Sequence, residues 1–274
     1  MKYLAASIQM TSMKDRGRNA ERAAELVEEA AERGAVLAGL PENWLIFRDG
    51  GDPPPDHVGP DTPEMLRLRD ICRNKKMTLV AGTVPEAAPN GKMYNTSYVI
   101  GADGEIVGKY RKIHLFDVSI SGGESHKESD HVEPGNEAVV VETKCGPIGL
   151  SVCYDLRFPE LFRLLSAKGA RVIFLPAAFT LHTGKDHWVT LLRARAIENL
   201  LYVIAPGQFG RNTDRRQTFG KSLIADPWGN VIAMAPEREC VVVAEIDYDA
   251  QDMIRKQLPA LDHIRRSLFG MAEK

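Results

Sequence analysis

Short apolar segments alternate with amphipathic ones along most of the chain. From Asn19 to Arg33, alanine and valine recur on one helical face, glutamate lies mostly on the other, and Gly34 follows. This pattern predicts a surface helix that ends at a glycine. Short apolar runs at 2–10 and 35–40 predict strands on either side of it. The same criteria predict strands at 77–84, 94–100, 105–111, 139–143, 148–153, 171–175, 201–205, 222–225, 231–234 and 241–246, and helices at 63–75, 159–168 and 187–199.

Helices and strands alternate in both halves of the chain, with hairpins added. This order predicts an α/β (α+β layered) fold in which sheets are covered by helices. No linker, low-complexity tract or shift of composition divides the 274 residues, which are enough for a substantial core. We therefore expect one domain over residues 1–274, with a helical C-terminal segment from about residue 248.

Composition and charge exclude several classes of protein. The 35 basic and 37 acidic residues are scattered and give a formal net charge of −2, unlike the basic surface of a nucleic-acid binder. No apolar run reaches the ~18 residues of a membrane span, and the first ten residues are too interrupted for a signal peptide. The cysteines are widely separated, without metal-ligand spacing. We expect a soluble cytoplasmic protein with free thiols, no metal, no cofactor, and no nucleic-acid or membrane partner.

Cys153 is the most informative of these cysteines. It ends an apolar strand and opens the polar turn Cys153–Glu160, after which Pro159 begins a helix. A strand, a tight turn and a helix present the thiol at the carboxyl edge of a sheet, where open α/β sheets place their chemistry. A buried cysteine that only fills space is the alternative, but the charged turn directly after the thiol argues against it.

A nucleophilic cysteine needs a base and a group that stabilises the oxyanion. None of the seven histidines can be paired with Cys153 from sequence, so a Cys–His protease stays open without support. Glu42 and Lys112 also follow predicted strands. Most glutamates and lysines are solvated surface residues, but strand ends of complementary chemistry converge in such folds, so these two are candidates.

The segments Leu40–Glu42, Tyr110–Asp117 and Cys153–Glu160 together resemble the three signatures of the nitrilase (carbon–nitrogen hydrolase) superfamily. They occur in the order and with the spacing of that family. The resemblance continues to Asp226–Gly229 and the C-terminal segment, so it covers nearly the whole chain. It implies a nitrilase-like αββα four-layer sandwich and a Glu–Lys–Cys triad.

The resemblance also implies roles for single residues. Glu42 would be the general base, and Cys153 the nucleophile that forms a thioester. Lys112 would stabilise the oxyanion together with the backbone N–H of Tyr154, and its charge would favour a thiolate. The family's second glutamate, which orients the lysine or the substrate, matches Glu128. Its nearby competitor Glu124 is better explained as a solvated loop residue.

Within the family, Thr183–Trp188 and Leu192–Asn199 look like the branch that holds deaminated glutathione amidase and omega-amidase. In that branch an arginine and a threonine, here Arg157 and Thr183, bind the carboxylate end of the substrate. A planar guanidinium suits this role. A local salt bridge from Arg157 to a neighbouring carboxylate, Asp155 or Glu160, is an equally good explanation.

Other positions bear on specificity and assembly. Arg193–Arg195 and Gly207–Arg211 resemble the deaminated glutathione type more than the omega-amidase type. Lys185-Asp186 and the loop 119–123 depart from the usual pattern near the expected substrate entrance. The helix that carries Arg193, Arg195 and Glu198 helps to build the family dimer, so we expect a homodimer or a larger homo-oligomer, with residues 248–274 at the interface. An exposed helix face explains the Arg/Glu pattern equally well. Trp188 and Trp228 suit core or dimer packing.

The leading hypothesis is an amidase that hydrolyses a linear amide through a Cys153 thioester and releases an acid plus an amine or ammonia. A deaminated-glutathione-like molecule or another 2-oxo-acid amide is the expected substrate. Alternatives are an omega-amidase acting on 2-oxoglutaramate, an N-carbamoyl amidase, a nitrilase or an acyltransferase. A non-catalytic binding relative is an alternative from a different class.

Overall fold

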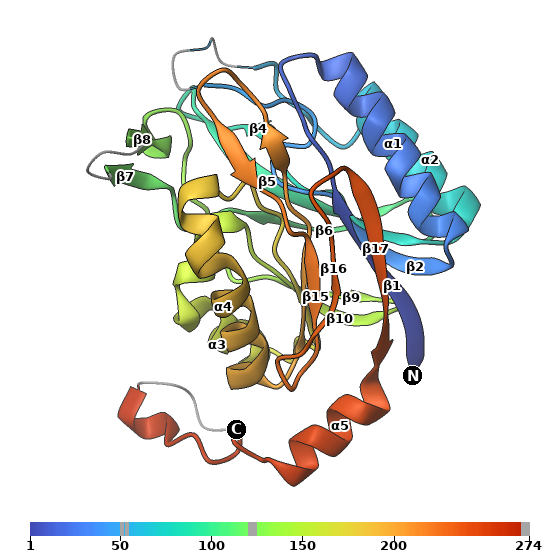
Figure 1. Ribbon diagram of the computed structural model, residues 1–274, viewed down its shortest axis with the longest axis vertical. Helices are drawn as coiled ribbons and strands as arrows, with labels where there is room; N and C mark the ends of the chain where they lie inside the picture. The colour runs from blue at the N-terminus through green and yellow to red at the C-terminus, as the bar shows by residue number, and fades with distance from the viewer. Residues whose placement is uncertain (50–51, 53–54, 120–124, 270–274) are drawn as a thin grey trace.

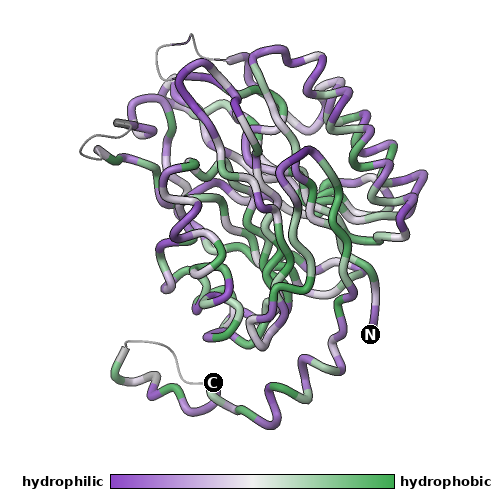
Figure 2. Tube along the Cα trace, viewed as in Figure 1, coloured by the Kyte–Doolittle hydropathy of each residue, from purple (hydrophilic) through white to green (hydrophobic). Residues whose placement is uncertain are grey.

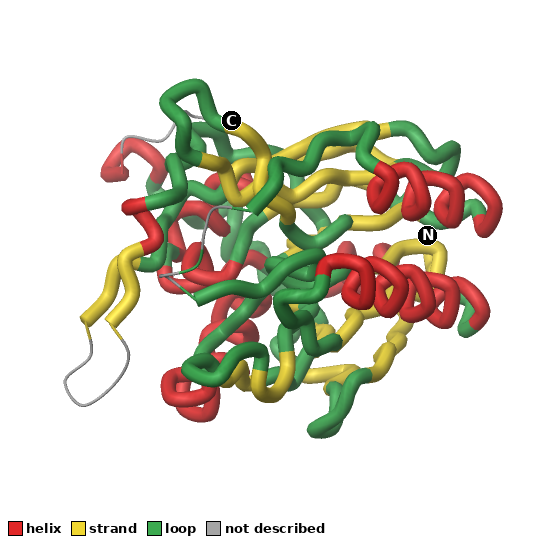
Figure 3. Tube along the Cα trace, turned by 90° about the horizontal axis from the view of Figure 1, so that it is seen from above, coloured by secondary structure: helices red, strands yellow, loops and turns green. Residues whose placement is uncertain are grey.

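The computed structural model describes residues 1–49, 52, 55–119 and 125–269. Two β-sheets pack face to face in the middle of the molecule (Figure 1). Helices α1 (Arg16–Glu32) and α2 (Pro63–Lys75) cover one sheet, and α3 (Pro159–Ala167) and α4 (Leu181–Asn199) cover the other. Figure 3 shows α1 and α2 side by side on one flank. The predicted αββα layering is confirmed.

The first sheet has seven strands, and its order β17-β1-β2-β3-β5-β4 continues from β5 to β6. Its centre is parallel, because β1 runs alongside β2 and β2 alongside β3. The long C-terminal strand pairs antiparallel with β1 along its whole length. The bounds are β1 Lys2–Gln9, β2 Ala35–Gly39, β3 Thr78–Val80, β4 Val84–Ala87, β5 Met93–Ile100, β6 Ile106–Arg111 and β17 Cys240–Asp247.

The second sheet has six strands in the order β16-β15-β12-β11-β10-β9. Again the central strands β10, β11 and β12 are parallel, and the flanking pairs are antiparallel hairpins. In both sheets the parallel strands therefore end at one edge. The bounds are β9 Val140–Thr143, β10 Gly146–Leu150, β11 Val172–Phe174, β12 Tyr202–Ala205, β15 Leu223–Ala225 and β16 Val231–Met234.

Successive residues along the strands of the first sheet point alternately into two separate apolar cores. Ala5, Leu37 and Val80 belong to the core that includes the second sheet, whereas their neighbours Ala6 and Leu79 belong to the core under α1 and α2. Successive strand residues point to opposite faces, so a strand buried on both faces is apolar throughout. Figure 2 shows the hydrophobic positions gathered along the central strands.

Three features differ from the predicted elements. The run 77–84 forms two strands, because the chain turns at Gly82, whose φ is +50° and where a Cβ would lie 2.1 Å from the Pro41 carbonyl oxygen. Helix α4 begins six residues before the predicted start. Two short pairs were not predicted: β7 (Asp117–Ser119) with β8 (Ser125–Lys127), which projects from the body (Figure 3), and β13 (Phe209–Arg211) with β14 (Gln217–Phe219).

The C-terminal segment leaves the sandwich after β17 (Figure 1). Helix α5 (Tyr248–Gln257) is anchored at its start, where the Tyr248 hydroxyl donates to the Cys145 carbonyl at 2.6 Å and Gln251 is fully buried. Further along, Met253 and Leu268 are exposed. This segment therefore presents apolar side chains away from its own core. Among the described helices, none is long and apolar enough to cross a bilayer.

Candidate active site

The ends of three strands bring Glu42, Lys112 and Cys153 together. Glu42 follows β2, Lys112 follows β6 directly, and Cys153 follows β10. All three are buried, with 3%, 2% and 8% of each residue exposed. They line one cavity of about 40 Å³, and Glu128 lines it as well. Because β2 and β6 belong to one sheet and β10 to the other, the cavity is built where the two sheets meet.

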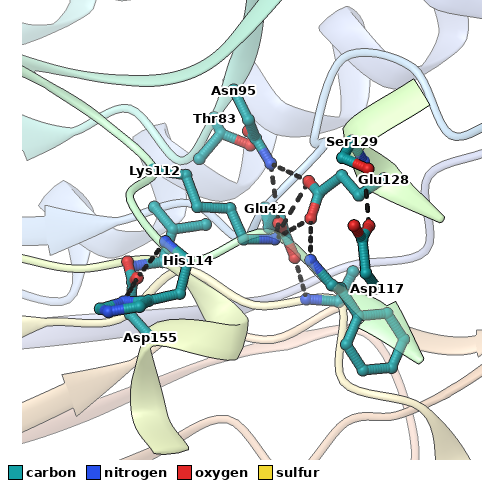
Figure 4. A network of polar contacts seen from close by, with 12 residues as sticks. Glu42, Thr83, Asn95, Lys112, His114, Asp117, Glu128, Ser129 and Asp155 are labelled. Carbon is teal, nitrogen blue, oxygen red and sulfur yellow. Dashed lines mark hydrogen bonds and ion pairs between the residues drawn. The ribbon is translucent and has the colours of Figure 1, made fainter. Parts of the chain in front are cut away.

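Lys112 lies between two carboxylates (Figure 4). Its Nζ is 3.1 Å from Glu42 Oε1 and 2.8 Å from Glu128 Oε2. Glu128 comes from a single 3₁₀ turn (Glu128–Asp130) after β8, and its Oε2 also accepts from the Phe116 N–H at 2.7 Å. The ammonium is thus held from two sides, and the cluster of three charges carries a net charge of −1.

The Glu42 carboxylate has a hydrogen bond at each oxygen besides its ion pair. Asn95 Nδ2 donates to Oε1 at 2.9 Å, and the Ala178 N–H donates to Oε2 at 2.9 Å. The same Asn95 amide reaches Glu128 Oε1 at 3.3 Å, so it links the two glutamates (Figure 4). These donors fix the orientation of the Glu42 carboxylate.

The charged states of Lys112 and Glu128 support each other. Burial alone would lower the pKa of Lys112, but the carboxylates of Glu128 and Glu42 outweigh it and raise that pKa. Burial alone would raise the pKa of Glu128, but the Lys112 ammonium and the hydrogen bonds lower it. An opposite charge at ion-pair distance explains both directions. At neutral pH the cluster therefore holds a cation beside an anion.

The Cys153 thiol is in the opposite situation. Burial raises its pKa well above the usual value, the Glu42 carboxylate adds to the rise, and Lys112 opposes it. The positive charge of Lys112 is already balanced by two carboxylates. The predicted effect of Lys112, which favours the thiolate, is therefore present, but burial and Glu42 outweigh it, and the pKa of the thiol stays raised beside a carboxylate that can accept its proton.

Cys153 also has a constrained backbone. Its φ is +47°, in the left-handed region, which costs of order 1–2 kcal/mol for a residue with a side chain. Its N–H donates to the Pro176 carbonyl at 2.9 Å, at the end of β11. The turn is therefore held against the neighbouring parallel strand, with the thiol directed into the cavity.

Asp155 connects the cysteine turn to the strand end that carries Lys112. It is fully buried, and its carboxylate accepts from the Val152 N–H at 2.8 Å and the Tyr110 hydroxyl at 2.7 Å. The other oxygen contacts the backbone N–H and the Nδ1 of His114 at 3.1 and 2.7 Å, and Figure 4 shows this pair beside Lys112. The Asp155 carboxylate thus fixes the backbone next to Cys153 relative to the backbone next to Lys112.

We expect Asp155→Asn to lower the free energy of unfolding by about 2–4 kcal/mol, because an amide cannot accept all of these donors and leaves buried groups without a partner. Urea denaturation monitored by circular dichroism measures the loss. Asp186→Asn is the matched control, since Asp186 is exposed on α4 and the same change there should cost less than about 0.5 kcal/mol. Equal, small effects of both substitutions would contradict the linking role.

The structure places the other predicted residues around the same cavity. Tyr154, Arg157 and Thr183 all line it. The Arg157 guanidinium lies 5.2 Å from the centre of the Phe179 ring and 3.2 Å from His187 Nδ1. Among the described residues it makes no ion pair, so the alternative of a local salt bridge is not borne out. Thr183 lies in the first turn of α4, where its hydroxyl is 2.9 Å from that of Thr180.

Four residues of the site were not identified from the sequence. All four are polar and buried or half-buried. His126 and Arg216 line the cavity, whereas Asn95 and Asp155 form hydrogen bonds with the residues that build it. Asn95 could have been noticed in the sequence, because it is a polar residue with a low preference for strands inside a predicted strand. Glu124 and positions 120–123 of the loop 119–123 lie outside the described residues. Lys185 and Asp186 are exposed on α4 and do not line the thiol cavity.

In the described ranges, no group of three or more His, Cys, Asp or Glu side chains is arranged to hold a metal ion. The four cysteines are free thiols. Of the residues predicted to be catalytic, the cavity therefore contains two carboxylates, one ammonium and one thiol.

Two packed sheets covered by helices on both sides, with such a cavity at one edge, define a nitrilase-fold protein. The chain belongs to the carbon–nitrogen hydrolase family, whose model matches residues 4–255. A deaminated glutathione amidase of Synechocystis is 43% identical over 265 residues, which are 95% of this chain and 97% of that protein. An omega-amidase of Xenopus tropicalis is 35% identical over 279 residues, which are 100% of this chain and 99% of that protein.

A solved structure gives the same result for the fold. The NitFhit protein of Caenorhabditis elegans superposes with a TM-score of 0.88 at 36% identity, over 97% of this chain and 66% of that one. The chain therefore shares its whole described sandwich with one part of that protein. The nitrilase resemblance of the three sequence segments is confirmed.

Proposed function

We propose that the protein is an amidase that cleaves a linear C–N bond through a thioester on Cys153. The observation that carries this proposal is the Glu42–Lys112–Glu128 ion-pair cluster beside a buried thiol in one cavity. Such a cluster meets the three needs of acyl transfer by a thiol, which are a proton acceptor, an oxyanion partner and a nucleophile. No metal or cofactor is required by these steps.

In the first step, the Cys153 sulfur attacks the amide carbonyl carbon while its proton passes to the Glu42 carboxylate. The oxyanion that forms is stabilised by the Lys112 ammonium and the backbone N–H of Tyr154. When the C–N bond breaks, Glu42 returns the proton to the leaving nitrogen, and an amine or ammonia departs. The raised pKa of the thiol suits this order, because proton transfer and attack occur together rather than from a preformed thiolate.

In the second step, Glu42 accepts a proton from water, and the hydroxide oxygen attacks the thioester carbonyl. Collapse of the second oxyanion releases the carboxylic acid, and the proton returns from Glu42 to the cysteine sulfur. Glu128 keeps Lys112 in place throughout, since both of its oxygens contact Nζ. It is thus a positioning residue rather than a proton carrier.

The acid part of the substrate is a 2-oxo acid whose carboxylate binds Arg157 and Thr183. Two features support this assignment: both side chains line the thiol cavity, and the Arg157 guanidinium has no ion-pair partner among the described residues. The relatives named deaminated glutathione amidase and omega-amidase support the same class of substrate. Lys185-Asp186 and the loop 119–123 are the positions where specificity would depart from these relatives.

A side-by-side kinetic comparison tests the proposal. The wild-type protein is assayed with deaminated glutathione, 2-oxoglutaramate, a carbamoyl amino acid and a simple nitrile. We expect the highest kcat/KM for one of the two 2-oxo-acid amides, by at least roughly 10²-fold over the other two classes. Turnover of only the nitrile or only the carbamoyl compound would contradict the substrate class, and no turnover of any would favour a non-catalytic relative.

The protein is further proposed to act in the cytoplasm as a homodimer of one domain, residues 1–274. Four free thiols suit a reducing compartment. Apolar side chains are exposed on one flank of the second sheet, where Arg193 Nε donates to the Gly229 carbonyl at 2.7 Å and joins the turn 226–230 to α4. These side chains are Ile197, Trp228, Ile232 and Met234.

We expect Ile197→Arg to convert a dimer into monomers, because a charge would be buried at the centre of the contact. Analytical ultracentrifugation measures the change. Leu66→Arg is the control, since Leu66 is 42% exposed on α2, on the other side of the sandwich, against 45% for Ile197. A monomeric wild-type protein, or a dimer that survives Ile197→Arg unchanged, would contradict this contact.

A further inference from the structure

Arg195 lies on α4, the helix expected to contribute to the homodimer, but the residue is buried, with 5% exposed. Its guanidinium is directed into the protein. Both Nε and Nη2 donate to one acceptor, the Leu156 carbonyl, at 3.0 and 2.7 Å. Leu156 belongs to the short 3₁₀ turn Cys153–Arg157, which begins with the nucleophile. The side chain of Arg195 therefore connects α4 to the cysteine turn.

The local sequence explains why the Leu156 carbonyl needs a side-chain partner. In a 3₁₀ turn, each carbonyl accepts from the N–H three residues further along the chain. For Leu156 that residue is Pro159, which has no N–H. Leu156 is fully buried, so water cannot replace the missing donor without a cost. Arg195 supplies two N–H groups from one rigid plane, which a lysine cannot do.

The guanidinium of Arg195 is itself held in place. Its Nη1 pairs with Glu198 Oε1 at 3.1 Å, about one turn further along α4. The guanidinium carbon lies 5.4 Å from the centre of the Phe162 ring on α3, and Figure 1 shows α3 and α4 together over the second sheet. Because burying a charge is costly and an apolar side chain could fill the same space, stability alone does not explain an arginine here.

The turn that Arg195 contacts is strained. Cys153 has a φ of +47°, and a strained backbone persists only where the surrounding contacts fix it. At the start of the turn, the Cys153 N–H donates to the Pro176 carbonyl at 2.9 Å. Near its end, Arg195 binds the Leu156 carbonyl. The thiol and the Tyr154 N–H lie between these two contacts, so both depend on the conformation of this turn.

We propose that Arg195 is a positioning residue for the reaction: its two hydrogen bonds to the Leu156 carbonyl keep the cysteine turn in its strained conformation. This inference rests on the proposed amidase function and adds to it a residue outside the cavity. Arg195 is not among the described residues that line the thiol cavity, so it acts through the turn. Without the two hydrogen bonds the turn would relax, and a displacement of ~1 Å can lower a rate by roughly 10²-fold.

The experiment measures steady-state kinetics, with the 2-oxo-acid amide that the wild type hydrolyses fastest, and urea denaturation of the full chain. We expect Arg195→Gln to lower kcat roughly 10- to 100-fold and to change KM by less than about 3-fold. KM is preserved because Arg157, the proposed ligand of the substrate carboxylate, keeps its contacts with Phe179 and His187. Arg195→Lys keeps the cation beside Glu198 but loses the planar pair of donors, so its kcat should lie roughly 3- to 10-fold below that of the wild type.

Arg171→Gln is the matched control. The Arg171 guanidinium also donates to a backbone carbonyl, that of Tyr248 at 2.9 Å, and its side chain is only 21% exposed. It directly precedes β11, where it holds the start of α5, and it does not line the thiol cavity. We expect Arg171→Gln to lower the free energy of unfolding but to keep kcat within about 2-fold of the wild type.

A purely structural role of Arg195 predicts that both glutamine variants lose stability and keep kcat. That result, an equal loss of kcat in both, or an Arg195→Lys variant with the kcat of the wild type would overturn the positioning role. If Arg195→Gln does not fold, Arg195→Lys decides, because it keeps the charge and the ion pair. A wild-type protein that hydrolyses no 2-oxo-acid amide would instead count against the proposed function itself, so the two failures are distinguishable.

Discussion

Replacing Cys153 by alanine is expected to abolish turnover, with kcat falling by at least roughly 10³-fold, because no other described residue that lines the cavity carries a thiol to form the acyl intermediate. The fold should tolerate the change. Cys153 is a small buried side chain, and alanine can adopt the same backbone conformation at the same cost. We expect the free energy of unfolding to change by no more than about 1.5 kcal/mol. Steady-state kinetics and urea denaturation measure the two effects.

Cys240→Ala is the matched control, because Cys240 is a half-buried free thiol on β17, outside the cavity. It should keep its activity within about 2-fold. Isothermal titration should also show that Cys153→Ala still binds the substrate. A Cys153→Ala variant with more than trace hydrolysis would mean that the reaction does not pass through a covalent intermediate.

Replacing Lys112 by methionine is expected to have the second largest effect. The change keeps most of the length of the side chain but removes the cation between Glu42 and Glu128, whose side chains are 4% and 11% exposed. Breaking a buried ion pair costs about 3–5 kcal/mol, since an uncompensated charge remains. The oxyanion also loses its partner, so kcat should fall by roughly 10²–10³-fold. Urea denaturation and steady-state kinetics at pH 7 measure both.

The loss of stability should depend on pH in a defined direction. The pKa of Glu128 is lowered in the folded wild-type protein, so its contribution is present above the unfolded pKa of about 4.3 and is lost as pH falls through the folded pKa. The pKa of Lys112 is raised, so its contribution is present below about pH 10.4 and is lost as pH rises through the folded pKa. The difference between wild type and variant should therefore be largest between roughly pH 5 and 10 and shrink below pH 4.

Lys109→Met is the control, on the strand β6 that directly precedes Lys112. Lys109 pairs with Glu86 at 2.7 Å but is 46% exposed, and such pairs contribute less than about 1 kcal/mol. Its kcat/KM should not change. Equal losses of stability for Lys109→Met and Lys112→Met would show that the Lys112 cluster is no more than an ordinary ion pair.

Most of the fold could be predicted from the sequence because its signals are local. Helix α2 coincides with its prediction, since Pro63 starts it and its last turn is basic. The elements that were missed depend on distant contacts. The chain turns at Gly82 because the Pro41 carbonyl lies against it, and α4 extends back to Leu181 because Gly184 allows close packing on Phe219. A window of neighbouring residues contains neither contact.

The residues of the site also fall into those that could be predicted from the sequence and those that depend on distant contacts. Glu42, Lys112 and Cys153 follow strands that end at one edge, so their convergence could be expected from topology. Asn95 and Asp155 could not be assigned, because their roles consist of hydrogen bonds to residues 53 and 45 positions away. The raised pKa of the thiol could not be predicted either, because it depends mainly on how deeply Cys153 is buried and then on the nearby Glu42 carboxylate, and only coordinates show the burial.

The most direct test of the covalent route is the mass of the protein during turnover. The wild-type enzyme is mixed with excess 2-oxo-acid amide, quenched with acid within milliseconds, and examined by intact and peptide mass spectrometry. We expect an added mass equal to the acyl part of the substrate, on the peptide that contains Cys153 and lost on alkaline hydroxylamine treatment. Hydrolysis that proceeds with no adduct on that peptide at any quench time, together with an active Cys153→Ala variant, would contradict the account.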